Sequence, residues 1–236
     1  MSLEEAAHAI GVHDTRGRTG AERLAALEAG QEEPSRSVLQ NMARKYHRSL
    51  LIFYLDAPPK VGDRGQDFRL APNAGPPAYN ATLDALIRDI KSRQRLVRSL
   101  LEDEDAVSIP YVGSATMSDG PSALAERITE VLSFRLAIFR ERGSVGDAFS
   151  YLRARIEGAG IFVLLAGNLG SHHSNLPADI FRGFAISDPI APFIVINDQD
   201  ARAAWSFTAL HEVAHVWLGT TGVSGAAAGT ALERLC

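Results

Sequence analysis

A chain of 236 residues has room for one large domain or two small ones, and 46% hydrophobic with 22% charged residues is typical of a globular protein. The net charge of −4 gives no general attraction to nucleic acid or anionic membranes, and the single cysteine excludes an internal disulfide. The N-terminus lacks the pattern of a signal peptide, and no apolar run reaches the roughly eighteen residues that cross a bilayer. These observations predict a cytoplasmic protein without membrane contact.

Residues 1–57 are predicted to be all-helical. Ser2 and Glu5 have the spacing of a capping box, in which each side chain accepts a hydrogen bond from the other residue's backbone. Helices are predicted over residues 2–10, 21–29 and 34–46. The apolar run 50–55 fits a helix or a strand equally well.

Residues 58–81 are rich in proline, glycine, aspartate and asparagine and are predicted to be a linker. Three helices are predicted after it, over residues 82–104, 122–141 and 145–159. The first of them is long and charged, with an apolar face of Leu83, Leu86, Ile87, Ile90, Leu96, Val97, Leu100 and Leu101.

The pattern then changes from helices to strands. Apolar runs at residues 160–165 and 192–197 predict two strands, and the shorter run 184–186 predicts a third. A helix of about twenty residues follows, capped near Asn197 or Asp198 and ended by Gly219, and the segment 219–230 is predicted to be a mobile loop. The expected fold class is α+β, with a second domain over residues 82–236.

The last predicted helix carries the most informative residues of the chain, His211, Glu212 and His215, in an H-E-x-x-H pattern. Positions i and i+4 share one helix face, so both imidazoles can bind one metal ion while Glu212 acts as the base for a metal-bound water. The flanking residues carry no charge, which predicts a buried helix. The pattern therefore indicates a zinc-dependent hydrolase; two unrelated histidines on a solvated helix are the alternative interpretation.

A catalytic zinc site usually takes three protein ligands and leaves a fourth position for water. The only candidates after His215 are Glu233 and Cys236, and a His-His-Glu set is a known catalytic composition. Glu233 is therefore the predicted third ligand. A solvated surface acid is the alternative for Glu233, and an inert thiol is the favoured interpretation of Cys236.

Three further features have both a functional and a structural interpretation. The strand 192–197 is either a sheet edge that holds the substrate as an added strand or a plain core strand. Arg182 either supports the site or pairs with a carboxylate, and pairing is favoured. His172 and His173 are either metal ligands or, as we favour, part of a solvated loop, because adjacent side chains usually point apart.

Several of these segments together resemble the ImmA/IrrE family of metallopeptidases, in the version with an N-terminal helix-turn-helix of the XRE type. In the peptidase portion the resemblance is carried by Arg153, Ile156-Glu157, Gly160-Ile161, 181–184, 192–197, 207–215 and 233–236. In the front portion it is carried by Leu24, 27–30, Pro34, Leu39, Ala43 and the Asp67-Phe68-Arg69 tripeptide.

This resemblance implies a cytoplasmic peptidase with a zincin-like domain that cuts a transcriptional repressor in stress response or mobile-element regulation. It also implies that His211, His215 and Glu233 bind zinc, with manganese as an alternative metal, and that Glu212 is the general base and acid. The expected partner is a protein substrate, namely the repressor.

The chain departs from the family pattern at both ends. The usual first helix of an XRE domain is missing, and residues 1–60 hold equal numbers of basic and acidic residues, which argues against DNA binding. The candidate DNA-binding patch is Arg36, Arg44, Lys45 and Arg48, with a solvated helix face as the alternative.

At the other end, the chain stops three residues after Glu233, which suggests a domain truncated at its C-terminus. Self-cleavage after Cys236 is one hypothesis, and a complementary C-terminal fragment of the same protein would then be a partner. The rival function is a non-catalytic DNA- or protein-binding regulator, such as a toxin–antitoxin component, with a vestigial peptidase fold.

Overall fold

The computed structural model describes residues 2–55, 77–224 and 236. These residues form helices and one four-stranded sheet, so the mixed α and β composition that the sequence predicts is confirmed. The chain divides into two compact units, and the division falls between Ala85 and Leu86 within one helix. Within the described ranges, no helix combines the length and apolar content that crossing a bilayer requires.

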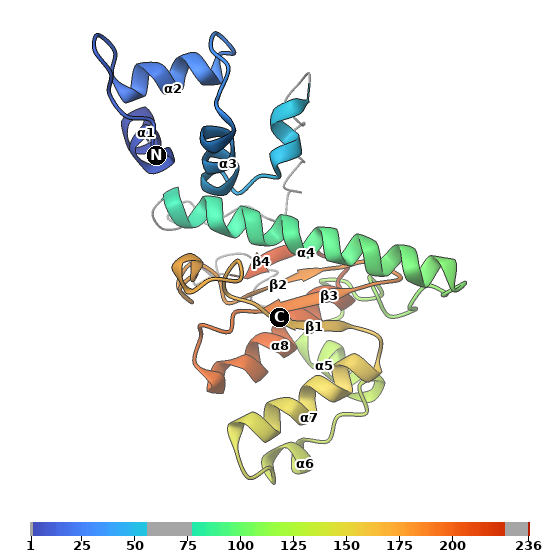
Figure 1. Cartoon of the computed structure of the whole chain (residues 1–236). Helices are drawn as coiled ribbons and strands as arrows, with labels where there is room; N and C mark the ends of the chain where they lie inside the picture. Colours follow the sequence, from blue (N-terminus) through green and yellow to red (C-terminus); the bar gives the residue numbers. More distant parts are fainter. Residues whose placement is uncertain (1, 56–76, 225–235) are drawn as a thin grey trace. The chain divides into compact units, whose positions relative to one another are not determined.

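The N-terminal unit contains three short helices, α1 (Leu3–Ile10), α2 (Gly20–Glu28) and α3 (Arg36–Lys45), which Figure 1 shows in blue. Each begins at a hydroxyl residue whose side chain accepts a backbone N–H, namely Ser2, Thr19 and Ser35. The capping box of Ser2 and Glu5 is present as predicted, and Thr19 forms a second one with Glu22.

A small core joins these three helices, because their apolar stripes face one another. Helix α1 contacts both α2 and α3. Leu24 and Ile10 are almost completely buried at the centre of a cluster that also contains Ala6, Ala7, Val12 and Met42. The apolar run whose structure the sequence left ambiguous is a 3₁₀ helix, η1 (Leu50–Tyr54).

The long charged helix α4 (Pro77–Asp103) begins five residues before the predicted start at residue 82, so residues 77–81 are helix and not linker. Proline is tolerated in the first turn of a helix, because its missing N–H would have no helical partner there. The remainder of the predicted linker up to residue 76 lies outside the described residues.

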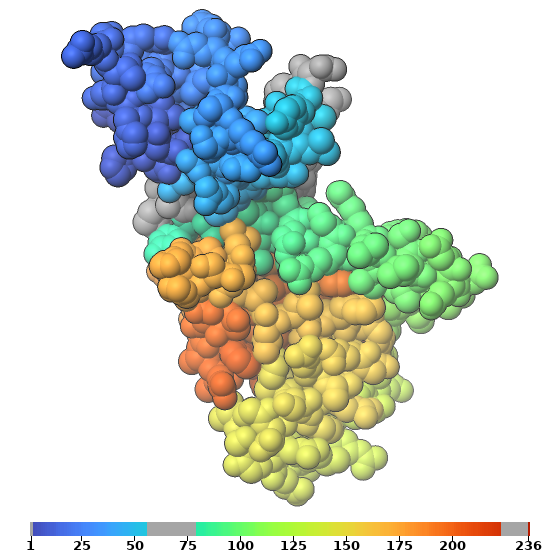
Figure 2. All heavy atoms as spheres, viewed as in Figure 1, coloured from blue at the N-terminus to red at the C-terminus, as the bar shows by residue number. Residues whose placement is uncertain are grey.

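The apolar face predicted for this helix is wrong at Leu96 and Leu100, while Val97 and Leu101 are half-buried. Leu83, Leu86 and Ile90 are buried, whereas Leu96 and Leu100 are more than half exposed. Figure 2 shows the C-terminal half of α4, in green, on the surface of the molecule. Gln94 is buried instead, and its amide donates a hydrogen bond to the backbone oxygen of Ala191.

One predicted helix over residues 122–141 is two in the structure, α5 (Pro121–Val131) and α6 (Leu136–Arg140). The chain turns between them at Ser133, whose φ of +46° is left-handed and ends the first helix. The next helix, α7 (Val145–Gly158), agrees with its prediction.

The sheet contains β1 (Phe162–Leu165), β2 (Gly183–Ile186), β3 (Phe193–Ile196) and β4 (Gly222–Ser224), in the order β1-β3-β2-β4. Strand β3 pairs parallel with β1 and antiparallel with β2. It is therefore a central core strand, and the prediction of a substrate-binding edge at residues 192–197 is wrong. Strand β4 lies within the segment 219–230 that the sequence predicts to be a mobile loop, so this prediction is wrong at residues 222–224, which pair with β2.

Helix α8 (Arg202–Trp217) packs against β2, β3 and α7. Figure 1 shows α7 and α8 on one side of the sheet and α4 on the other. The predicted cap at Asn197 or Asp198 is wrong, since Ala201 occupies the N-cap and no side chain caps this helix. Asn197 instead donates from its amide to the backbone oxygens of Leu176 and Phe181, at 2.9 Å each.

Candidate metal centre

The three residues of the H-E-x-x-H pattern all lie on α8, and the sheet buries two of them. Glu212 is 0% exposed and His215 is 4% exposed, because the helix packs against β2 and β3. His211, one turn earlier, is half-buried. The predicted burial of this helix is therefore confirmed, and the alternative of two histidines on a solvated helix is wrong.

The two histidine rings turn the same nitrogen toward each other. Nε2 of His211 and Nε2 of His215 are 3.2 Å apart, and the ring planes are inclined by 74°. Two nitrogens bound to one tetrahedral zinc at about 2.05 Å are separated by about 3.3 Å. The spacing of this pair therefore fits two ligands of one zinc ion, although a hydrogen bond between the rings gives a similar distance.

The other ring nitrogen of His215 faces a residue beyond the helix end. Nδ1 of His215 lies 2.9 Å from Oγ1 of Thr220, and that hydroxyl lies 3.3 Å from the backbone oxygen of His215. When the hydroxyl donates its only hydrogen to the backbone oxygen, it accepts a hydrogen bond from Nδ1–H. Nε2 of His215 then carries the lone pair, as a metal ligand must.

Glu212 lies against strand β2 at a position where only glycine fits. A Cβ atom on Gly183 would lie 2.8 Å from Oε1 of Glu212, 2.7 Å from Cγ2 of Thr208 and 2.9 Å from the backbone oxygen of Val195. All three distances are shorter than ordinary contacts, so the missing side chain makes the space that the carboxylate occupies.

The exposed side of the centre carries an aromatic ring. Phe207 is 69% exposed, and its ring lies nearly parallel to that of His211, with 6.3 Å between the centroids. An apolar ring of this size usually avoids water, so this flank of His211 offers a surface for an apolar group.

The third ligand predicted from the sequence, Glu233, lies outside the described residues. Among the described residues, which include Cys236, no three histidines, cysteines or acids form a group that could hold a metal. Cys236 therefore does not join His211 and His215. Its side chain is half-buried and packs against the core of the C-terminal unit.

The remaining candidates lie on elements other than α8. His172 and His173 form part of the 3₁₀ helix η2 (His172–Ser174), and both are exposed. The centroids of their two rings lie 3.8 Å apart, so the expectation that these adjacent side chains point apart is wrong. Arg182 is exposed, and among the described residues it forms no ion pair.

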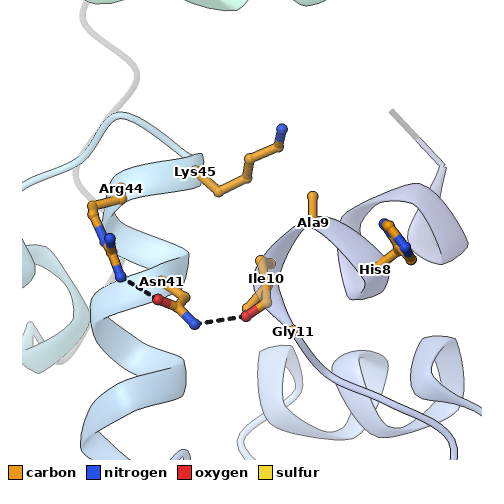
Figure 3. A pocket seen from close by; sticks show the side chains of 7 residues that line it. All are labelled: His8, Ala9, Ile10, Gly11, Asn41, Arg44 and Lys45. Carbon is orange, nitrogen blue, oxygen red and sulfur yellow. Dashed lines mark hydrogen bonds between the residues drawn. The ribbon is translucent and has the colours of Figure 1, made fainter.

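In the N-terminal unit, three of the four basic residues predicted as a patch lie on α3, and Arg48 follows that helix. Arg36 and Lys45 are nine residues apart, about two and a half turns, and therefore lie on opposite sides of the helix. Figure 3 shows Arg44 and Lys45 beside a hollow that His8, Ala9, Ile10, Gly11 and Asn41 also line. Arg44 donates to the amide oxygen of Asn41, whose nitrogen donates to the backbone oxygen of Ile10 at 2.8 Å.

Sequence reasoning missed two residues of the centre, Gly183 and Thr220. Gly183 had no local signal, because the need for glycine arises from a contact with a helix that follows much later in the chain. Thr220 had one, since a glycine that ends a helix also fixes the next residue over the last turn. Comparisons of the chain with family models, curated proteins and solved structures found no match.

Proposed function

We propose that this protein is a zinc-dependent endopeptidase whose metal is bound by His211, His215 and Glu233. The observation that carries the proposal is the distance of 3.2 Å between Nε2 of His211 and Nε2 of His215. Glu212, which lies between these two histidines in the sequence, is buried on the same helix. Zinc fits this donor set best, because imidazole and carboxylate ligands are the usual ones of catalytic zinc; manganese is the alternative.

The chain's own residues supply the proton transfers. A bound zinc would lower the pKa of a water molecule and polarise the scissile carbonyl. Glu212 takes the proton from the attacking water and passes it to the leaving amine, so that one peptide bond breaks and one water is consumed. The buried position of Glu212 excludes bulk water from this carboxylate, which strengthens its electrostatic interactions.

For the substrate, we propose a transcriptional repressor, as the resemblance to the ImmA/IrrE family implies. The same resemblance supports a zincin-like C-terminal domain and an XRE-like N-terminal region. The small sheet beside the H-E-x-x-H helix and the three short N-terminal helices are compatible with these two assignments.

The test is cleavage of candidate repressors encoded near the gene, incubated with the protein and either zinc or manganese. Intact-mass measurement of the products is expected to show one or a few defined cuts. Glu212→Gln is the matched control, since it keeps the shape of the side chain and removes the base.

Cuts that appear equally with Glu212→Gln would come from a contaminating protease and would contradict the proposal. A well-folded protein that takes up no zinc under zinc-replete conditions would contradict it as well, and would favour a non-catalytic regulator.

A further inference from the structure

The end of α8 has a geometry that places one side chain over His215. The N–H of Gly219 donates to the backbone oxygen of Val216 at 3.1 Å, and the N–H of Thr220 donates to the backbone oxygen of His215 at 3.0 Å. These two bonds, together with the φ of +68° at Gly219, form a Schellman motif.

This motif leaves the Thr220 side chain beside the imidazole of His215, the residue whose backbone oxygen accepts the Thr220 N–H. The Thr220 hydroxyl lies 2.9 Å from Nδ1 of His215 and 3.3 Å from the backbone oxygen of the same residue. Thr220 thus contacts His215 through both its backbone and its side chain, and the ring is fixed relative to the helix end.

We propose that Thr220 is a positioning residue, which holds His215 as the Nδ1–H tautomer and so places the lone pair of the ring on Nε2, the atom that would bind the metal. This proposal rests on the metal centre in the proposed function and deepens it. Ligand histidines usually donate their second ring N–H to a partner that fixes the tautomer and the ring orientation, and removal of such a partner typically weakens metal affinity 10- to 100-fold.

The neighbouring Thr221 provides a matched control. Its hydroxyl accepts a hydrogen bond from the backbone N–H of Ser187 at 2.9 Å and therefore ties the same segment to the end of β2. Thr221→Val removes a hydroxyl next to the site and leaves His215 untouched, whereas Thr220→Val removes the hydroxyl that contacts the ring. Thr220→Ser keeps that hydroxyl.

The first measurement uses the metal-free full chain. The ring nitrogens of His215 are observed by long-range proton–nitrogen NMR at about pH 8, where an imidazole is neutral. Wild type, Thr220→Ser and Thr221→Val are expected to show a protonated Nδ1 and an unprotonated Nε2. Thr220→Val is expected to show a mixture of tautomers.

The second measurement is zinc affinity, determined by competition with a chelator. Thr220→Val is expected to bind zinc about 10- to 100-fold more weakly than wild type. Thr220→Ser and Thr221→Val are expected to remain close to wild type, and circular dichroism checks that all four proteins are folded.

Two results would overturn the role of Thr220 and are distinguishable from failure of the proposed function. The role is wrong if wild type binds zinc and Thr220→Val binds it equally well, or if His215 of the wild type carries its proton on Nε2. Failure of the wild type itself to bind zinc would instead overturn the metal centre, and the positioning role with it.

Discussion

The two units of this protein are stabilised in different ways. In the N-terminal unit every helix from α1 to α3 has a hydroxyl N-cap, and the core is a small cluster around Leu24. In the C-terminal unit α8 has no side-chain cap, and it is held by a sheet whose strands come from distant parts of the chain. Local signals define the first unit, whereas long-range packing defines the second.

The difference matters because the candidate metal centre belongs to the unit that long-range packing defines. Glu212 depends on Gly183 of β2, and His215 depends on the turn that follows α8. A change in the C-terminal core should therefore reach the metal centre, while a change in the N-terminal core should not.

The largest effect is expected for Trp217→Ala. Trp217 is fully buried and stacks on Tyr111, with 4.0 Å between the ring centroids. Removal of a buried indole typically costs about 3–5 kcal/mol, so urea unfolding of the C-terminal unit should shift to much lower denaturant. Zinc binding should weaken with it, and an unchanged unfolding midpoint would contradict the account of this core.

Leu24→Ala makes the matching change in the N-terminal unit. Its buried neighbours in the core cluster are residues of α1, Val12, and Met42 of α3, and the expected cost is about 2–5 kcal/mol. We expect the N-terminal unit to unfold earlier while zinc affinity stays at the wild-type value. A loss of zinc affinity as large as that of Trp217→Ala would break the distinction between the two units.

Gly183→Ala tests the contact between β2 and α8. The added methyl group would overlap Thr208, Glu212 and the backbone of β3, and overpacking of this kind costs about 1–3 kcal/mol. The proposed peptidase activity should fall by a larger factor than the loss of folded protein alone explains, because Glu212 must move. Gly158→Ala, at the end of α7 with open space around it, is the control that should leave both unchanged.

Thr19→Ala tests the local signals of the N-terminal unit. It removes the capping box in which Thr19 and Glu22 bond each other's backbone, and the expected cost is about 0.5–2 kcal/mol. Thermal unfolding should show a small shift in the N-terminal transition and none in zinc affinity. A shift as large as that of Leu24→Ala would mean that the cap contributes as much as the core.

The smallest expected effect concerns the pH dependence of the C-terminal unit. Burial alone would raise the pKa of Asp188, but the backbone N–H groups of Ala191 and Ile190 and the Arg98 guanidinium lower it below its ordinary value of 3.8. A carboxyl whose folded pKa is lowered stabilises the protein above the unfolded pKa and loses that contribution as pH falls through the folded pKa.

Asp188→Asn should therefore be less stable than wild type near neutral pH, and the difference should shrink as the pH falls below the ordinary pKa of 3.8. Denaturant unfolding of both proteins across this range measures the difference. A gap in stability between them that does not narrow on acidification would contradict the assigned role of the carboxylate.

What the sequence could predict follows the same division. The caps at Ser2 and Ser35, the helix-ending glycines at 11 and 219, and the H-E-x-x-H pattern are local, and the structure contains them all. The position of strand 193–196 within the sheet and the requirement for Gly183 depend on contacts between distant segments. The spacing and composition of a short segment do not reveal which distant segment it will contact.

The most direct test of the central claim is the zinc content of the purified protein, measured by elemental analysis after exposure to zinc and removal of the excess. One zinc per chain in the wild type, lost in both His211→Ala and His215→Ala while both variants remain folded, is the result that we predict. A folded wild-type protein without bound zinc, or variants that retain it, would contradict the assignment of these histidines as metal ligands.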